Sequence, residues 1–213
     1  MNDPGPGMLL IDGTDVRRYP LQQLRSQVAL IPQDPFLFSL TIRNNLTYDE
    51  PDRELPPIEH AAQLAELLDA IDEFPDGMET IVGERGMTLS GGQKQRATLA
   101  RGLIRDARIL AMDDCFSSVD TRTEERILGR LKEVRQGRTT LLVSHRVSTA
   151  RHADRIFVME DGRILESGTH AELIAKGGYY SDLEAVQSNQ DQDRARKAAL
   201  LRNLDIDVRV VNG

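Results

Sequence analysis

The sequence has 213 residues, of which 39% are hydrophobic and 29% charged, so it can form one globular domain, or a large part of one, with a buried core. Its net charge of -7 disfavours nucleic acid as the main partner, because surfaces that bind nucleic acid cluster Lys and Arg. Cys115 is the only cysteine, which excludes an internal disulfide and predicts a small buried hydrophobe. No apolar run approaches the roughly 20 residues that cross a bilayer, so any membrane-spanning part is expected on another segment or chain.

The first half of the chain contains two predicted strands and one long predicted helix. Residues 8–13 are typical of a short strand that ends in an Asp-Gly turn. Val28–Ile31 is an apolar run closed by proline, which predicts a buried strand whose end presents Gln33. From Ile58 to Ile71, apolar residues recur at spacings of three and four, which predicts a single amphipathic helix.

The second half alternates predicted helices and strands. Strands are expected at Ile109–Met112 and Thr139–Val143, and helices from Gly91 or Gly92 to Arg105 and over Thr121–Val134. An Asp-Gly hairpin and two short closing helices follow, at Ile156–Leu165, His170–Ala175 and Tyr179–Val186. Such alternation predicts an α/β fold with a mostly parallel sheet and helices on its faces, in which ligands bind at the C-terminal ends of the strands.

Two carboxylates stand at the end of one predicted core strand. Asp113 and Asp114 directly follow its apolar run, where one carboxylate can hold Mg²⁺ and a second can orient water toward a phosphate. For an isolated pair, the commoner interpretation is two carboxylates that cap or solvate a turn. The pair therefore needs support from other parts of the sequence.

A glycine-rich segment at the start of a predicted helix gives that support. Gly91 and Gly92 carry no side chains, so backbone N–H groups can approach an oxyanion, and Ser90 adds a hydroxyl. The helix directs the positive end of its dipole to the same place. A plain glycine-rich helix start is the alternative, but the helix leads into the strand that ends in Asp113, so an anion site is favoured.

Six segments resemble, in order, the motifs of the ABC transporter nucleotide-binding domain of the multidrug-exporter type. Any one of these motifs can occur by chance, but six of them in the family's order and spacing are specific to the family. The similarity covers about residues 3–183. The segments are the Q-loop at Gln33, the X-loop at Val82–Gly86, the signature loop at Leu89–Gln93, the Walker B strand at Ile109–Asp113, the D-loop at Ser117–Asp120 and the switch-histidine loop at Ser144–Arg146.

The resemblance implies a P-loop NTPase-like core with a helical subdomain at about residues 40–105, in one domain over residues 1–187, followed by a polar tail over residues 188–213. It implies ATP and Mg²⁺ as cofactors. The implied partners are a second nucleotide-binding domain, in a head-to-tail dimer, and the transmembrane domains of an exporter. The expected location is the cytoplasmic face of the plasma (inner) membrane, through transmembrane segments absent from this chain.

The resemblance also implies roles for individual residues. Asp113 would hold Mg²⁺, Gln33 would sense the metal and link the site to the membrane part, and Asp114 and His145 would be catalytic, His145 by contacting the γ-phosphate. Taken alone, His145 is an ordinary polar residue after a strand. The other implied roles are communication across the dimer by Asp120, contact with the coupling helices by Glu84 and Arg85, and closure over ATP of the other subunit by Leu89, Ser90, Gly91, Gly92 and Gln93.

The sequence departs from the family's pattern in lacking the phosphate loop Gly-x-x-x-x-Gly-Lys-Ser/Thr. None of its four lysines is preceded by Gly and followed by Ser or Thr. In the family this loop, the Walker A region, lies upstream of the position where this chain starts. We therefore expect an N-terminally truncated chain that binds ATP poorly and does not hydrolyse it alone.

A second departure is Asp114, which stands where the family has Glu. The Asp carboxylate is withdrawn by about an ångström, and a misplacement of that size lowers rates on the order of 10²-fold. This resembles the degenerate site of heterodimeric exporters, so we expect a heterodimer in which this chain contributes the slow site and Ser90 completes the partner's fast one. The alternative, that Asp114 is an adequate base in a homodimer, stays open.

Two other functions compete with ATP hydrolysis coupled to export. A DNA-repair or chromosome-organising ATPase of the same superfamily would need long heptad segments and a basic surface, which the sequence lacks. A non-catalytic or regulatory domain is favoured by Asp114 and the absent phosphate loop. The intact signature loop and His145 favour a working nucleotide cycle.

Overall fold

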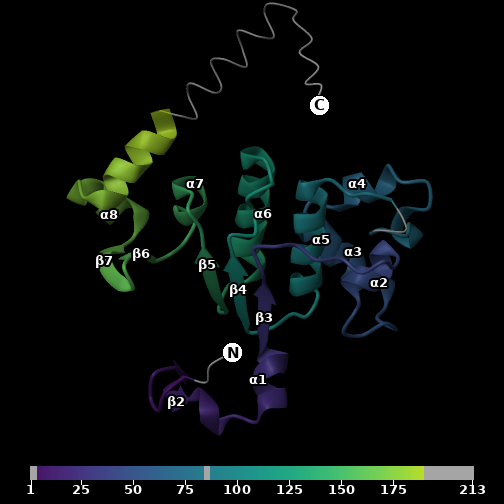
Figure 1. Cartoon of the computed structure of the whole chain (residues 1–213), viewed down its shortest axis with the longest axis horizontal. Helices are drawn as coiled ribbons and strands as arrows, with labels where there is room; N and C mark the ends of the chain where they lie inside the picture. Colours follow the sequence, from purple (N-terminus) through teal and green to yellow (C-terminus); the bar gives the residue numbers. More distant parts are fainter. Residues whose placement is uncertain (1–3, 84–86, 190–213) are drawn as a thin grey trace, which may run out of the picture. The chain divides into compact units, whose positions relative to one another are not determined.

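The computed structural model describes residues 4–83 and 87–189, which form two compact units, Met1–Ser144 and His145–Gly213. Figure 1 shows their helices and strands. The expected X-loop residues Glu84 and Arg85 lie outside the described residues, as does most of the expected polar tail. No helix in the described ranges is both long enough and apolar enough to cross a membrane.

A three-stranded parallel sheet lies at the centre of the first unit. Its order is β3 (Val28–Ile31), β4 (Ile109–Asp113) and β5 (Thr139–Val143), and the pairing sets Ile31 beside Met112 and Asp113 beside Val143. The three strands lie where they were predicted. β3 and β4 bury alternate residues, whereas β5 is mostly exposed. Before them come a β-hairpin, a 3-10 turn and a helix, namely β1 (Leu10–Ile11), β2 (Thr14–Asp15), η1 (Val16–Arg18) and α1 (Leu21–Gln27).

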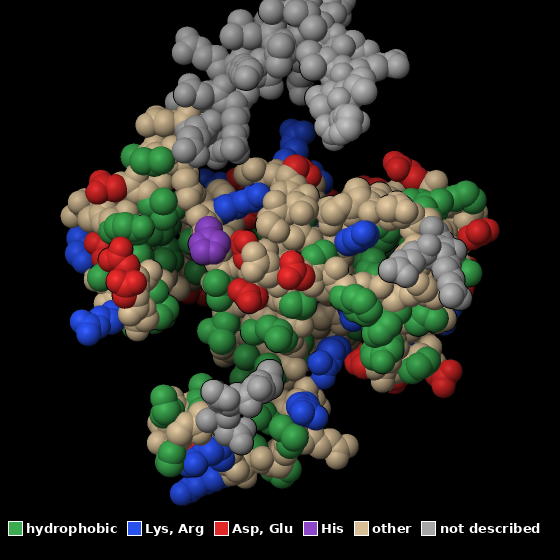
Figure 2. Space-filling model, viewed as in Figure 1, with side chains coloured by type: hydrophobic (Ala, Val, Ile, Leu, Met, Phe, Trp, Pro, Cys, Tyr) green, Lys and Arg blue, Asp and Glu red, His purple; other side chains and the backbone are tan. Residues whose placement is uncertain are grey.

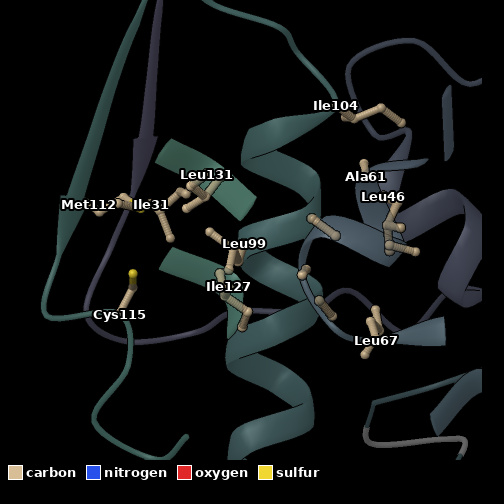
Figure 3. Packing of buried hydrophobic residues seen from close by; sticks show 14 of the residues in the cluster. Ile31, Leu46, Ala61, Leu67, Leu99, Ile104, Met112, Cys115, Ile127 and Leu131 are labelled. Atoms are coloured by element: carbon tan, nitrogen blue, oxygen red, sulfur yellow. The ribbon is translucent and has the colours of Figure 1, made fainter. Parts of the chain in front are cut away.

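Two helices cover one face of this sheet. In α5 (Gly91–Leu103) and α6 (Thr121–Val134), the apolar residues Leu99, Ile127 and Leu131 are buried and pack with Ile31 and Met112, as Figure 3 shows. Strand side chains alternate between faces, and on the other face Leu30 and Leu141 remain 59% and 57% exposed. The α/β fold with a parallel sheet and flanking helices is thus confirmed.

The predicted single helix over Ile58–Ile71 is wrong, because the structure has two helices there. They are α3 (Leu55–Leu64) and α4 (Leu68–Asp72), and both lie in a group with α2 (Ile42–Leu46) and the 3-10 turn η2 (Gly77–Glu79). Glu66 separates them with a left-handed φ of 54°, a conformation that ends a right-handed helix. The apolar face was predicted correctly, since Ala61 and Ile71 are each 2% exposed.

Glu66 joins this helical group to α5 and α6. Arg126 Nε donates to Glu66 Oε2 at 2.9 Å, and Arg130 Nη1 lies 2.6 Å from Glu66 Oε1. Arg96, on α5, donates to the Glu66 carbonyl oxygen. The Glu66 side chain is 9% exposed, so its charge depends on these guanidinium groups in place of water. The break between α3 and α4 is therefore stabilised by tertiary contacts.

Replacing Glu66 with Gln is expected to lower the free energy of unfolding by about 2 kcal/mol, because the buried carboxylate loses its charge and two ion pairs weaken. This loss of stability is smaller than that expected for a fully buried ion pair, because the Arg126 and Arg130 side chains are 48% and 42% exposed. Urea denaturation of the chain measures it. Glu59→Gln, at an exposed position of α3, is the matched control and is expected to change stability by less than about 0.5 kcal/mol. Equal effects of the two substitutions would contradict the role of Glu66.

The described part of the second unit, residues 145–189, contains an antiparallel hairpin and three helices. β6 (Ile156–Glu160) pairs with β7 (Arg163–Gly168), and the turn residues Asp161 and Gly162 have φ values of 48° and 74°, as an Asp-Gly hairpin turn requires. The helices are α7 (Val147–Ala150), α8 (His170–Lys176) and residues 179–189. They pack around a small core made by Val147, Ile156, Leu173 and Tyr180. The predicted hairpin and both predicted closing helices are confirmed, and the second helix continues to residue 189.

Candidate functional site

The ends of two neighbouring strands bring predicted site residues to one edge of the sheet. Asp113 is the last residue of β4, and Gln33 follows the end of β3 by two residues. Because Ile31 pairs with Met112, both side chains leave the same C-terminal edge, and both are exposed. His145 is the first residue of the second unit. The parallel register thus joins two residues that are 80 positions apart (113 − 33) in the sequence.

The oxygen atoms at this edge fit a magnesium ion that is bound together with a phosphate. Asp113 offers a carboxylate and Gln33 an amide oxygen, the hard ligands that Mg²⁺ prefers. Among residues 4–83 and 87–189, no group of three His, Cys, Asp or Glu side chains could hold a metal ion. A site of this kind does not need such a group, because Mg²⁺ keeps waters and takes substrate phosphate oxygens as ligands.

Asp114 adopts a left-handed backbone conformation at the point where the chain leaves β4. Its φ is 39°, and its N–H donates to the Val143 carbonyl at 3.0 Å, which extends the β4–β5 pairing by one residue. Asp tolerates this conformation better than most residues, because its short polar side chain can bond locally. The side chain is partly buried beside exposed Asp113, so the two carboxylates have different surroundings.

The signature segment forms the N-terminal cap of α5. The Ser90 Oγ accepts from the Gln93 N–H at 3.2 Å, and the Ser90 N–H donates to the Gln93 Oε1 at 2.8 Å, a capping box. Leu89, 4% exposed, anchors the segment in the core. Because the Ser90 oxygen acts here as an acceptor, its own O–H can still donate to an anion. The capping box holds the helix start in the form that an anion site needs.

Gln95, which sequence reasoning missed, ties the signature helix to the loop after β4. It is 3% exposed, its Nε2 donates to the Ser117 Oγ at 2.6 Å, and its Oε1 accepts from the Ser118 N–H at 2.7 Å. The glycines serve the same contact, because a Cβ on Gly92 would lie 2.8 Å from the Ser118 carbonyl oxygen. A polar residue in a helix is otherwise expected to face solvent. The sequence feature that could have identified Gln95 is its position one helical turn after the paired glycines, on the same face of the helix.

The loop after β4 is held at both of its ends. Cys115 is 2% exposed, as predicted, and burial raises the pKa of its thiol to about 12. At the other end, the Asp120 Oδ1 accepts from the Thr123 N–H at 3.0 Å and caps α6. This backbone hydrogen bond lowers the pKa of Asp120, so its carboxylate stays charged at neutral pH. The loop thus connects Asp114 to the signature helix through a short, anchored segment.

A second group that sequence reasoning missed organises the segment after Gln33. Asn45 is 1% exposed, and its Oδ1 accepts from the Phe38 N–H at 2.9 Å and from Arg101 Nη2 at 2.8 Å. Arg101, near the end of α5, also donates to the carbonyl oxygens of Asn45 at 2.7 Å and Phe36 at 2.8 Å. The segment that carries Gln33 is therefore fixed to the helix that begins with the signature loop.

Exposed apolar side chains gather beside this segment, around α2 and the residues that flank positions 84–86. Figure 2 shows hydrophobic side chains over this part, on the right of the view, and acidic and basic side chains interspersed elsewhere on the same face. The exposed residues are Leu40 at 39%, Tyr48 at 58%, Ile81 at 53% and Met87 at 37%. A group of this kind on one surface is a candidate contact for another protein segment.

A parallel sheet with carboxylates and amides at its C-terminal edge, and a capped glycine-rich helix start tied to that edge, define a P-loop NTPase-like α/β domain. The family model described as "ABC transporter" matches residues 1–117. This chain belongs to the ABC transporter family.

Several known proteins are similar to this chain. The "Uncharacterized ABC transporter ATP-binding protein YknU" of Bacillus subtilis is 47% identical over 184 residues, which cover 86% of this chain and 32% of that protein. The "ATP-dependent lipid A-core flippase" of Vibrio parahaemolyticus is 45% identical over 186 residues, or 87% of this chain and 32% of the flippase. Among solved structures, a bacterial Atm1-family ABC exporter with ATP bound matches with a TM-score of 0.77 and 39% identity, covering 84% and 31% of the two chains. The chain thus spans about a third of the length of these relatives.

Proposed function

We propose that this chain is the ATP-binding and ATP-hydrolysing portion of an ABC exporter. The observation that carries the proposal is the contact between the signature helix and the loop after Asp113 and Asp114, made by Gln95 and Gly92. In a head-to-tail dimer, the strand edge would serve one ATP and Ser90 the ATP of the other subunit. The anchored loop would then couple the two sites. Relatives named as a lipid A-core flippase and an Atm1-family exporter support this function.

Within this proposal, Asp113 and Gln33 would hold Mg²⁺ with the ATP phosphates, and His145 would contact the γ-phosphate. Asp114 would orient the attacking water, while Leu89, Ser90, Gly91, Gly92 and Gln93 would close over ATP in the other subunit and Asp120 would communicate between subunits. Mg²⁺ would neutralise charge on the phosphates during transfer. The capping box at Ser90, the capped α6 at Asp120 and the shared strand edge all support these assignments.

The proposed partners are a second nucleotide-binding domain and transmembrane domains. The exposed apolar residues Leu40, Tyr48, Ile81 and Met87 support a contact with the membrane part. The sequence predicts the same role for Glu84 and Arg85, which lie outside the described residues. The proposed location is the cytoplasmic face of the plasma (inner) membrane. We also propose one nucleotide-binding domain over residues 1–187, with the helical subdomain at about residues 40–105, because α2 to α5 contact one another there.

We further propose that the parent protein is one half of a heterodimer and contributes the slow site. Asp114, with its shorter side chain and left-handed φ of 39°, supports this assignment. A non-catalytic or regulatory domain is the second candidate, and the same residue favours it. The two candidates can be distinguished by ATP hydrolysis. A slow-site subunit retains hydrolysis that depends on Asp113, and a non-catalytic or regulatory domain does not.

The function is tested in a chimera in which this chain replaces the matching third of the Vibrio parahaemolyticus flippase. After purification and reconstitution in lipid bilayers, the chimera is expected to hydrolyse ATP slowly. Asp113→Asn is expected to lower that rate on the order of 10²-fold or more, because Mg²⁺ loses its charged ligand. The 213-residue chain alone contains no phosphate-loop motif and is expected to show no hydrolysis. A folded chimera whose ATPase rate is the same with and without Asp113 would overturn the proposal.

A further inference from the structure

One side chain near the end of the described chain holds the backbone directly after His145. The Gln187 Nε2 donates to the His145 carbonyl oxygen at 2.8 Å, and the Gln187 Oε1 accepts from the Val147 N–H at 2.8 Å. One amide group thus bonds residues i and i+2, as a neighbouring strand would. These two bonds span 42 and 40 positions of sequence.

The Val147 N–H needs a partner from outside its own helix. Val147 is the first residue of α7, and the first N–H groups of a helix have no acceptor within the helix. The N-cap residue, Arg146, makes no side-chain cap hydrogen bond. Val147 is 5% exposed, so water reaches this N–H poorly. The Gln187 amide therefore caps α7 from a distance and fixes the residue before α7 at the same time.

The helix that carries Gln187 is itself anchored in the core of the second unit. Tyr180, 3% exposed, and Leu183 pack in the same cluster as Val147. The Tyr180 N–H donates to the Glu166 Oε2 at 3.0 Å, which ties the start of this helix to β7. The amide of Gln187 is therefore presented from a fixed helix. Its two bonds restrict the backbone angles of Arg146 and, through the His145 carbonyl, the ψ angle of His145.

We propose that Gln187 is a positioning residue that holds His145 in the orientation needed for ATP hydrolysis. The inference rests on the proposed function, in which His145 contacts the γ-phosphate. Gln187 acts only through the backbone and does not touch the nucleotide. Displacing a catalytic group by about 1 Å costs on the order of 10²-fold in rate, and partial loosening costs less. The C-terminal helix thus takes part in setting the hydrolysis rate.

The test compares Gln187→Ala, Gln187→Glu and the matched control Asn189→Ala, which removes an exposed amide from the same helix. In the flippase chimera, Gln187→Ala is expected to lower kcat for ATP hydrolysis about tenfold and to change KM by less than about twofold. Gln187→Glu keeps the size of the side chain and the oxygen that accepts from the Val147 N–H, but it loses the N–H that donates to the His145 carbonyl. It is therefore expected to lower kcat by a similar factor. Asn189→Ala is expected to leave kcat unchanged.

A second readout uses the 213-residue chain and does not depend on hydrolysis. Gln187→Ala is expected to shift the imidazole NMR signals of His145 and to speed hydrogen exchange of the Val147 amide, whereas Asn189→Ala is expected to change neither. Unchanged signals and exchange in Gln187→Ala, or equal changes in the control, would overturn the inference. If His145→Ala abolishes turnover but Gln187→Ala does not lower it, only the inference fails. If His145→Ala leaves turnover unchanged, the proposed role of His145 fails, and the rate effect of Gln187 fails with it.

Discussion

Replacing Asp114 with Glu in the flippase chimera is expected to raise ATP turnover on the order of 10²-fold, or roughly 2.7 kcal/mol of barrier. The physical reason is distance. The Glu side chain extends the carboxylate by one methylene toward the water that attacks the phosphate. Steady-state ATPase assays on the purified chimera measure the change. No increase in turnover would count against the proposal that this chain contributes a slow site.

The backbone conformation at residue 114 makes Asp114→Glu destabilising. Its φ is 39°, a left-handed conformation that Glu adopts less readily than Asp, so Asp114→Glu is expected to lower the free energy of unfolding by up to about 1 kcal/mol. Asp114→Asn is the matched control, because the Asn side chain tolerates the same φ but cannot act as a base. It is expected to keep stability and to reduce the residual turnover. If the Asp114→Asn chimera hydrolysed ATP as fast as the unsubstituted chimera, this carboxylate would have no part in hydrolysis.

Replacing Gly92 with Ala is expected to damage both the fold and the signature site. The new Cβ would lie 2.8 Å from the Ser118 carbonyl oxygen and 3.7 Å from its carbon, so α5 or the loop after β4 must move. Overpacking of this kind costs about 1 to 3 kcal/mol of stability. ATP turnover is expected to fall on the order of 10²-fold, because Ser90 and the loop that follows Asp114 move relative to each other.

Gly129→Ala is the control for this experiment. Gly129 also lies within a helix, α6, but a Cβ there would meet nothing within 4 Å. This substitution is expected to stabilise the chain by about 1 kcal/mol, since Ala is the better helix former, and to leave turnover unchanged. Thermal unfolding and ATPase assays compare the two variants. A stabilised and fully active Gly92→Ala variant would show that the contact with Ser118 is dispensable.

The regular elements near the site could be predicted because their signals are local. The strands β3, β4 and β5 are short apolar runs, and α6 begins at a capping Asp120 and ends where its apolar periodicity ends. The Asp161-Gly162 hairpin follows from two residues that accept positive φ. The motif residues Gln33, Ser90, Asp113 and Asp114 could also be located, since each stands at the end or the start of such an element.

The break at Glu66 could not be predicted from local pattern. The apolar spacing of three and four continues from α3 through α4, so periodicity alone favours one helix. The left-handed residue is stabilised by Arg126 and Arg130, which lie on α6, 60 or more positions later in the sequence. Tertiary contacts therefore overrode the helical signal of this segment.

The polar residues that organise the site depended wholly on the tertiary structure. Gln95, Asn45 and Gln187 find their partners 22, 56 and 42 positions away, and no short window of sequence contains both members of any of these pairs. Amino-acid order specifies where apolar runs, caps and turns lie, because those depend on neighbours along the chain. Which polar side chain is buried against which loop follows only once the sheet and helices have packed, because a buried hydrogen bond requires a partner that folding brings from elsewhere.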